Sequence, residues 1–177
     1  MARPDKLISG LTRLSGLVFL CLFSCVTENT PDGPSLSPGD PLPSFKVEMA
    51  DGSFVSNTSF IDKTGVIVFF NTSCPDCRKE LPVIGELYEL YKDDPDVLII
   101  AIARDEELTS ISEYWKENNL NIPFSPQKGR YIYNLFAKTI IPRTYISNRS
   151  AVITAAYGDS DMPSLQNLIN NLKAAGN

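Results

Sequence analysis

Short apolar runs alternate with segments of helical periodicity along most of the chain. The run at 66–70 is continuously apolar and rich in β-branched residues, which predicts a strand buried on both faces. Apolar residues then recur every three or four positions from Leu81 to Tyr91, which predicts a helix. A second buried strand is expected at 97–103. This alternation is typical of an α/β domain with a central sheet flanked by helices.

The remaining elements are expected before and after this unit. A small β-hairpin should open the domain, because 45–49 and 53–55 flank Asp51-Gly52, a favoured tight-turn pair. Further expected elements are a helix over 110–119 capped by Ser110 and Glu113, a short helix within 129–137, a hairpin formed by 143–146 and 151–156, and a closing helix over 163–175.

The first 24 residues have the pattern of an export signal. Basic residues precede the apolar run 17–23, which is followed by the small residue Ser24. The segment 22–25 (LFSC) resembles a bacterial lipoprotein signal, in which the cysteine is lipidated and becomes the new N-terminus. An ordinary cleaved signal peptide, in which Cys25 has no such role, is the alternative. We expect residues 1–24 to be a lipoprotein signal peptide and Cys25 to carry the lipid.

Residues 25–39 are rich in Thr, Asn, Ser, Gly and Pro and have no apolar face to bury. This composition predicts a flexible tether. Residues 40–177 are then expected to form one folded domain of ordinary size. The protein would face the periplasm in the cell envelope, anchored to a membrane by its lipid.

Composition and charge exclude several classes of function. The chain has a formal net charge of −5, which argues against a nucleic-acid partner. It contains no histidine, so Cys–His and Ser–His catalytic pairs and metal sites built on imidazole are excluded. We expect neither a metal nor another cofactor.

The expected chemistry lies in Cys74-Pro75-Asp76-Cys77, between the predicted strand and helix. The first sulfur should lie at a helix N-terminus, where the helix dipole and free N–H groups favour the thiolate. Cys77, one turn later, lies within reach of Cys74 for a disulfide. We therefore expect a redox pair in which Cys74 attacks and Cys77 resolves. A purely structural disulfide would stabilise little across so short a loop, and a zinc site would lack ligands.

The sequence around this pair, residues 69–82 (FFNTSCPDCRKELP), resembles the active-site strand, loop and helix of TlpA/ResA-like thioredoxin-family proteins, which are exported reductases. The resemblance covers roughly residues 38–177. It implies an α/β thioredoxin fold, with a central mixed β-sheet flanked by helices and an N-terminal β-hairpin extension. This chain departs from the family at Ser73, where tryptophan is usual, and at Ile141, where many relatives have threonine. Both positions lie where a partner would dock.

The resemblance also implies a substrate-binding surface. Residues 140–144 (IIPRT) are similar to the family's proline loop. A cis Ile141–Pro142 bond, as in the family, would place the backbone of Ile141 beside Cys74, where it could pair with an extended substrate segment. A trans turn proline is the alternative. Together with Ser73 and Pro75, Ile141 and Pro142 are the expected substrate contacts.

Glu80 is the third candidate catalytic residue, three positions after Cys77. In TlpA/ResA-like proteins a glutamate at this place is implicated in proton transfer or in tuning the thiols. The alternative is a solvated carboxylate paired with Lys79 or Arg78. An ionised Glu80 in a poorly solvated pocket would oppose thiolate formation, which favours a more negative potential and suits a reductase.

These observations predict a monomeric thiol–disulfide oxidoreductase that acts on exported protein disulfides. We expect it to work as a reductase supplied by a membrane electron donor. A thiol peroxidase of the peroxiredoxin kind is one alternative, although that class carries Thr or Ser where this chain has Asn71. A non-enzymatic thioredoxin-fold lipoprotein that binds partners is another, which the intact cysteine pair disfavours.

The lipoprotein signal makes a testable prediction. The mature protein should begin at a diacylglycerol-modified Cys25 and partition with membranes, because more than one acyl chain is needed for stable anchoring. Mass spectrometry of the mature N-terminus measures this. An unmodified start elsewhere, in soluble protein, would contradict the anchor.

Overall fold

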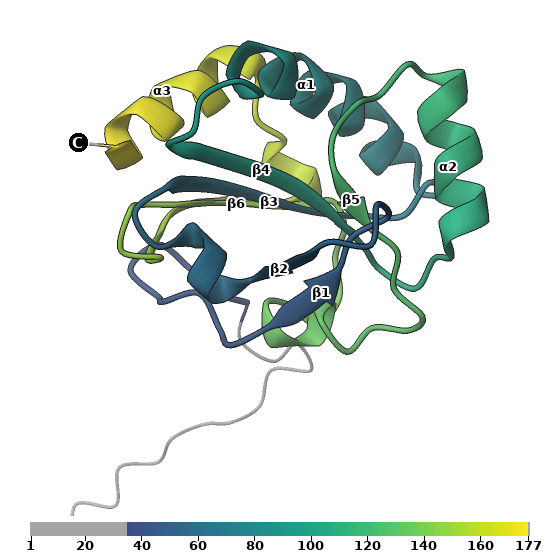
Figure 1. Ribbon diagram of the computed structural model, residues 1–177, viewed down its shortest axis with the longest axis horizontal. Helices are drawn as coiled ribbons and strands as arrows, with labels where there is room; N and C mark the ends of the chain where they lie inside the picture. The colour runs from purple at the N-terminus through teal and green to yellow at the C-terminus, as the bar shows by residue number, and fades with distance from the viewer. Residues whose placement is uncertain (1–34, 177) are drawn as a thin grey trace, which may run out of the picture. The chain divides into compact units, whose positions relative to one another are not determined.

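Five strands form a mixed sheet in the order β5-β4-β3-β6-β7, and two more form a separate small sheet, in the computed structural model drawn in Figure 1. The structure describes residues 35–176. The strands are β1 (Lys46–Glu48), β2 (Phe54–Ser56), β3 (Thr64–Phe70), β4 (Val97–Ala103), β5 (Phe124–Ser125), β6 (Arg143–Ser147) and β7 (Ile153–Tyr157). The helices are α1 (Pro75–Tyr91), α2 (Leu108–Glu117) and α3 (Leu165–Gly176), with 3-10 turns η1 (Asn57–Phe60), η2 (Tyr133–Leu135) and η3 (Asp159–Asp161).

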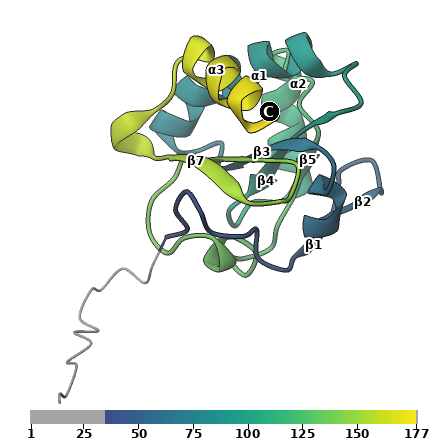
Figure 2. The same ribbon diagram turned by 90° about the vertical axis from the view of Figure 1, so that its left-hand side faces the viewer.

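The central strand β3 pairs on both sides, parallel with β4 and antiparallel with β6. All seven of its residues are buried, as its continuously apolar sequence requires. The sheet is therefore mixed, with helices against it and a β1–β2 hairpin before it, which confirms the fold expected from the sequence. Figure 2 shows α1 and α3 on one side of the sheet and the β1–β2 hairpin on the other.

Aromatic side chains fill the space on the hairpin side of the sheet. The ring of Phe69 lies 4.8 Å from that of Phe136 and 5.5 Å from that of Tyr133, measured between centroids. Phe136 in turn lies 5.5 Å from both Phe45 and Tyr145. These tilted and edge-on arrangements are the favoured ones for aromatic pairs. They hold the segment that contains η2 against the carboxyl half of β3.

The predicted capping of α2 is wrong. The helix expected over 110–119 begins at Leu108 and its N-cap is Glu107, so Ser110 and Glu113 form no capping box. The hydroxyl of Ser110 instead donates to the carbonyl of Glu107, inside the first turn. The short helix expected within 129–137 is observed as the 3-10 helix η2, which places Tyr133 and Phe136, three residues apart, in the core.

The chain enters the domain along its surface. Leu36 N donates to Phe136 O at 2.8 Å and Gly39 N donates to Ile153 O at 2.8 Å, so the last residues of the expected tether are hydrogen-bonded to the domain. The expected signal peptide and Cys25 lie outside the described residues. Within residues 35–176, no helix is both long and apolar enough to cross a bilayer.

Gly65 in β3 provides a test of the packing on the central strand. A Cβ atom there would overlap the ring of Phe60 and lie 2.5 Å from Ser147 Oγ. Phe60 and Ser147 are both buried and cannot move aside freely. We therefore expect Gly65→Ala to lower the free energy of unfolding by about 2 kcal/mol, as overpacking of a core does. Urea denaturation followed by Trp115 fluorescence measures this loss.

Gly176→Ala is the matched control, since its Cβ would meet Thr64 Oγ1 at an ordinary 3.6 Å. This variant should unfold at the same urea concentration as the parent, or slightly higher, because alanine favours the helix. Equal midpoints for Gly65→Ala and the parent would show that the packing around β3 is loose.

Candidate active site

Cys74 is the N-cap of α1, at the point where the chain leaves β3. Its sulfur accepts a hydrogen bond from the backbone N–H of Cys77 at 3.5 Å, and Pro75 occupies the first helical position. Proline is tolerated there because the N–H it lacks would have no partner within the helix. The helix N-terminus therefore points its free N–H groups at the sulfur of Cys74, as the sequence predicted.

The two thiols differ in accessibility. Cys74 is half-buried, whereas Cys77 is completely buried, and both are free thiols. Burial raises the pKa of the Cys77 thiol far above its ordinary value, and the neighbouring Cys74 raises it further. Cys77 is therefore protonated at neutral pH, and only Cys74 can meet a partner from outside.

The loop before Cys74 is held by a carboxylate from the next strand connection. Glu106, three residues after β4, accepts hydrogen bonds from the backbone N–H of Thr72 at 2.7 Å and from the Thr72 hydroxyl. Asn71 adds a second tie, because its side chain donates to Arg104 O at 3.2 Å and accepts from Ser73 N at 2.9 Å. These contacts fix the backbone from which Cys74 projects.

Glu106 was missed by the sequence analysis. It lies 34 residues from Thr72, so no local pattern links them. The available signal was its place just after the second buried strand. Parallel neighbouring strands end at the same edge of a sheet, which brings their following loops together.

The proline loop lies beside the sulfur of Cys74. The Ile141–Pro142 peptide bond is cis, and the Cys74 thiol donates to Ile141 O at 3.6 Å. This confirms the expected cis bond and the expected place of the Ile141 backbone. Pro142 is buried, while Ser73 and Pro75, the residues on either side of Cys74 in the sequence, are exposed.

Glu80 lies in the interior, between α1 and β6. It is only 3% exposed, and its Oε1 accepts a hydrogen bond from the Thr144 hydroxyl at 2.9 Å. Its other oxygen, Oε2, is buried and has no hydrogen-bond partner among the described residues. Burial raises the pKa of Glu80 to about 7, and the charge of Asp161 contributes in the same direction.

The solvated alternative for Glu80 is therefore wrong. Lys79 pairs instead with Asp76 at 2.7 Å, and Arg78 donates to the backbone carbonyl of Thr72. A buried glutamate that titrates near neutral pH is the kind of group that can exchange a proton during a reaction.

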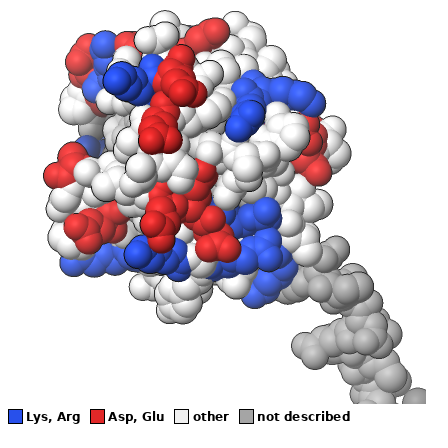
Figure 3. Space-filling model, turned by 90° about the vertical axis from the view of Figure 1, so that its right-hand side faces the viewer, with Lys and Arg blue, Asp and Glu red and all other residues white. Residues whose placement is uncertain are grey.

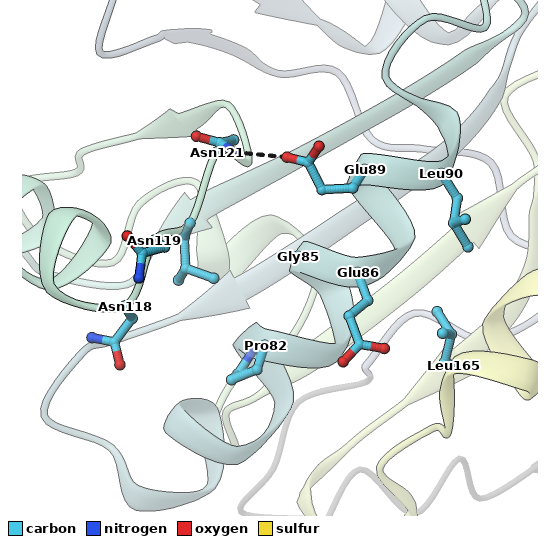
Figure 4. A pocket seen from close by; sticks show the side chains of 10 residues that line it. Pro82, Gly85, Glu86, Glu89, Leu90, Asn118, Asn119, Asn121 and Leu165 are labelled. Atoms are coloured by element: carbon cyan, nitrogen blue, oxygen red, sulfur yellow. Dashed lines mark hydrogen bonds between the residues drawn. The ribbon is translucent and has the colours of Figure 1, made fainter.

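The sulfur of Cys74 opens onto a polar cavity of about 360 Å³. Its walls are Asn71, Ser73, Cys74, Arg104, Asp105, Arg130 and Ile141. A separate hollow of about 520 Å³ lies between α1 and residues 118–121, where Asn121 donates to Glu89 at 2.7 Å (Figure 4). That hollow contains no cysteine. In the described part of the chain, no cluster of three or more Cys, Asp or Glu side chains could hold a metal ion.

Comparison with known proteins agrees with this geometry. Residues 37–172 match the family model described as Redoxin. The thiol-disulfide oxidoreductase ResA of Bacillus cereus (strain ATCC 10987 / NRS 248) is 27% identical over 135 residues, which cover 76% of this chain and 78% of that protein. ResA of Bacillus subtilis (strain 168) is 24% identical over 166 residues, which cover 90% and 92%.

Solved structures share the fold. A thiol:disulfide interchange protein of the thioredoxin family from Chlorobium tepidum TLS superposes with a TM-score of 0.67 at 23% identity, over 80% of this chain and 99% of that one. A secreted thiol-disulfide isomerase from Corynebacterium glutamicum superposes with a TM-score of 0.67 at 14% identity, over 83% and 95%. With its paired cysteines at the start of α1, the chain belongs to the Redoxin family and is a ResA/TlpA-like, thioredoxin-fold thiol–disulfide oxidoreductase.

Proposed function

We propose that this protein reduces disulfide bonds in exported proteins. The observation that carries the proposal is the asymmetry of the pair, with Cys74 accessible at a helix N-terminus and Cys77 buried behind it. An attacking thiol must reach its substrate, whereas a resolving thiol needs only to reach the first sulfur.

The proposed reaction proceeds in two exchanges. The Cys74 thiolate attacks one sulfur of the substrate disulfide, which forms a mixed disulfide and releases the other substrate sulfur as a thiolate that takes up a proton. Cys77 then loses its proton and attacks the Cys74 sulfur, which releases the second substrate thiol. Two electrons pass to the substrate, and the Cys74–Cys77 disulfide remains. A membrane electron donor would return two electrons to it.

Substrate would bind as an extended segment across the sulfur of Cys74. The backbone of Ile141 lies beside that sulfur and could pair with such a segment, next to the buried ring of Pro142. Ser73 and Pro75 are exposed and would contact the same segment. The small side chain of Ser73 leaves space for bulky substrate residues at this position.

Glu80 would act on the second exchange. Cys77 must lose a proton in an environment where burial raises the pKa of its thiol, and Glu80 is the buried carboxylate whose charge also acts on that thiol. With a pKa of about 7, Glu80 can accept a proton at neutral pH and release it afterwards. When ionised, it also disfavours a neighbouring thiolate, which suits a reductase.

The proposed location follows from the amino-terminal sequence. A signal peptide over 1–24, a lipid on Cys25 and a tether over 25–39 would hold the domain of residues 40–177 as a monomer at the periplasmic face of a membrane. One of the structural relatives is named as a secreted thiol-disulfide isomerase, which accords with export. The clients of such a protein would be other exported proteins.

The division of roles predicts which variant traps substrates. Cys77→Ser should accumulate mixed disulfides between Cys74 and client proteins, because the resolving thiol is absent. Non-reducing gels of cell-envelope extracts, followed by mass spectrometry of the trapped species, measure this. Insulin reduction by the variant should fall by about 100-fold or more, since turnover needs both thiols.

Cys74→Ser is the control for the trapping experiment. It should trap nothing, because the remaining thiol of Cys77 is buried. Trapping by Cys74→Ser and not by Cys77→Ser would reverse the two roles. Failure of the parent protein to reduce insulin would contradict the proposed activity itself.

Glu80→Gln should change the reactivity of the accessible thiol in a pH-dependent way. At pH 8 the parent carries an ionised Glu80, whose charge opposes further negative charge in the cysteine pair, so the variant should be alkylated about two- to fivefold faster. At pH 6 Glu80 is mostly protonated and resembles glutamine, so the two rates should agree. Iodoacetamide kinetics on the reduced proteins measure both rates. Glu86→Gln, an exposed change on the same helix, is the control and should match the parent.

The same variant should alter the pH dependence of stability. Because burial raises the pKa of Glu80 from 4.5 to about 7, the folded state holds this proton more tightly than the unfolded state. The favourable contribution is complete below pH 4.5 and declines as the pH rises to about 7, by about 3 kcal/mol in total. Urea denaturation should show this decline in the parent and not in Glu80→Gln. Identical profiles would mean that Glu80 is solvated in solution.

A further inference from the structure

Two arginines line the cavity into which the sulfur of Cys74 opens. Arg104 follows β4, and Arg130 lies in the connection between β5 and η2. We call them the arginine pair. They come from segments far apart in the sequence and meet only because the fold brings both connections to the edge of the sheet where β3 ends. The cysteine chemistry described above makes no use of them.

A tyrosine ring orients both guanidinium groups. The Cζ atom of Arg104 lies 5.2 Å from the centre of the Tyr133 ring, and that of Arg130 lies 5.9 Å from it. The hydroxyl of Tyr133 donates to Ile140 O at 2.6 Å, which fixes the ring next to the proline loop. Arg104 is held further by the hydrogen bond from its Nη1 to Thr139 O at 2.9 Å. The pair is therefore positioned before any substrate arrives.

The positive charge of the pair is not neutralised by an ion pair. Within residues 35–176, neither Arg104 nor Arg130 forms a salt bridge; the neighbouring Lys128 pairs with Glu107. Asp105 also lines the cavity, and its Oδ1 accepts a hydrogen bond from Gly129 N at 2.9 Å. Two cations and one carboxylate thus face the cavity. Figure 3 shows basic side chains gathered along the lower part of this end of the molecule, below a group of acidic ones.

We propose that the arginine pair binds a carboxylate that the substrate carries next to its disulfide, so that the protein prefers cysteines flanked by Asp or Glu. The inference rests on the proposed function and specifies its substrate class. Arginine suits this role because its planar group can donate two parallel hydrogen bonds to one carboxylate. The cavity places such a carboxylate within one or two residues of the attacked sulfur.

The arginine pair would act on binding and orientation and not on the exchange itself. Cys74 still forms the mixed disulfide and the substrate still releases one thiolate, so the electron balance of the reaction is unchanged. The positive charge would speed the approach of acidic segments and slow that of basic ones. Because the pair is partly exposed, this preference should weaken as salt is added.

The test uses disulfide-linked dimers of one short peptide that carries Asp, Asn or Lys on both sides of its cysteine. Rates of their reduction by the full-length reduced protein are divided by the rates with a small uncharged dithiol, which removes the intrinsic effect of the flanking charge on the disulfide. We expect the corrected rate to be about fivefold higher for the Asp peptide than for the Asn peptide, and lowest for the Lys peptide. In about 0.5 M salt the three rates should converge.

Arg130→Gln, at an exposed position, should lower the ratio of the Asp-peptide rate to the Asn-peptide rate at least twofold. Arg104→Lys keeps the charge and should retain most of the preference. Arg149→Gln removes the same charge at the opposite end of the sheet, where Arg149 pairs with Asp96 at 3.2 Å, and should retain all of it.

Equal corrected rates for the three peptides in the parent would overturn the carboxylate proposal while leaving the oxidoreductase function intact. Loss of preference in Arg149→Gln as well would show that net charge, and not the arginine pair, is responsible. Failure to reduce any of the three peptides would contradict the proposed function instead. The two failures are therefore distinguishable.

Discussion

The double pairing of β3 is the constraint on which the site depends. Phe70, the last residue of β3, lies opposite Ala103 of β4, and Phe69 lies opposite Arg143 of β6. Because β4 is parallel and β6 antiparallel, the end of β3 meets the end of one neighbour and the start of the other. Three loops distant in sequence are thereby brought together around one sulfur. A shift of either register by one residue would separate these loops and move the side chains of β3 to the opposite face of the sheet, where the packing does not fit them.

The burial of Cys77 creates a second requirement, because a nearby group must accept the proton that a resolving thiol loses. Cys77 and Glu80 occupy adjacent turns of α1 on its buried side, and each is more stable there in its neutral form. A completely apolar interior would contain no proton acceptor for a resolving thiol. In the proposed reaction Glu80 would accept that proton, and the cost of burying its carboxyl group is partly offset by the hydrogen bond from the Thr144 hydroxyl. The site thus combines a half-buried thiol that a partner can reach with a buried thiol that is more stable in its neutral form.

Local patterns were sufficient for the central elements. The strand 97–103 was predicted at its observed bounds, and β3 and α1 were predicted from an apolar run and a helical repeat. Short elements were harder, since the two residues of β5 give no periodic signal. The cysteine pair and the proline loop were found because each is a motif of consecutive residues that can be recognised in the sequence. Glu106 and the arginine pair were not, because their roles arise only where separate strands end together.

The backbone and the side chain of Ser73 differ in how firmly they are held. The backbone N–H of Ser73 is held by the Asn71 side chain, and the neighbouring Thr72 is held by Glu106. The exposed side chain of Ser73 is bonded only to Asn71, so it contributes little to the placing of the sulfur. Evolution can therefore exchange the residue at position 73 without moving the nucleophile. In the proposed substrate-binding role of Ser73, a change at this position would alter the choice of client and leave the redox chemistry of the cysteine pair intact, which also makes it a position for engineering.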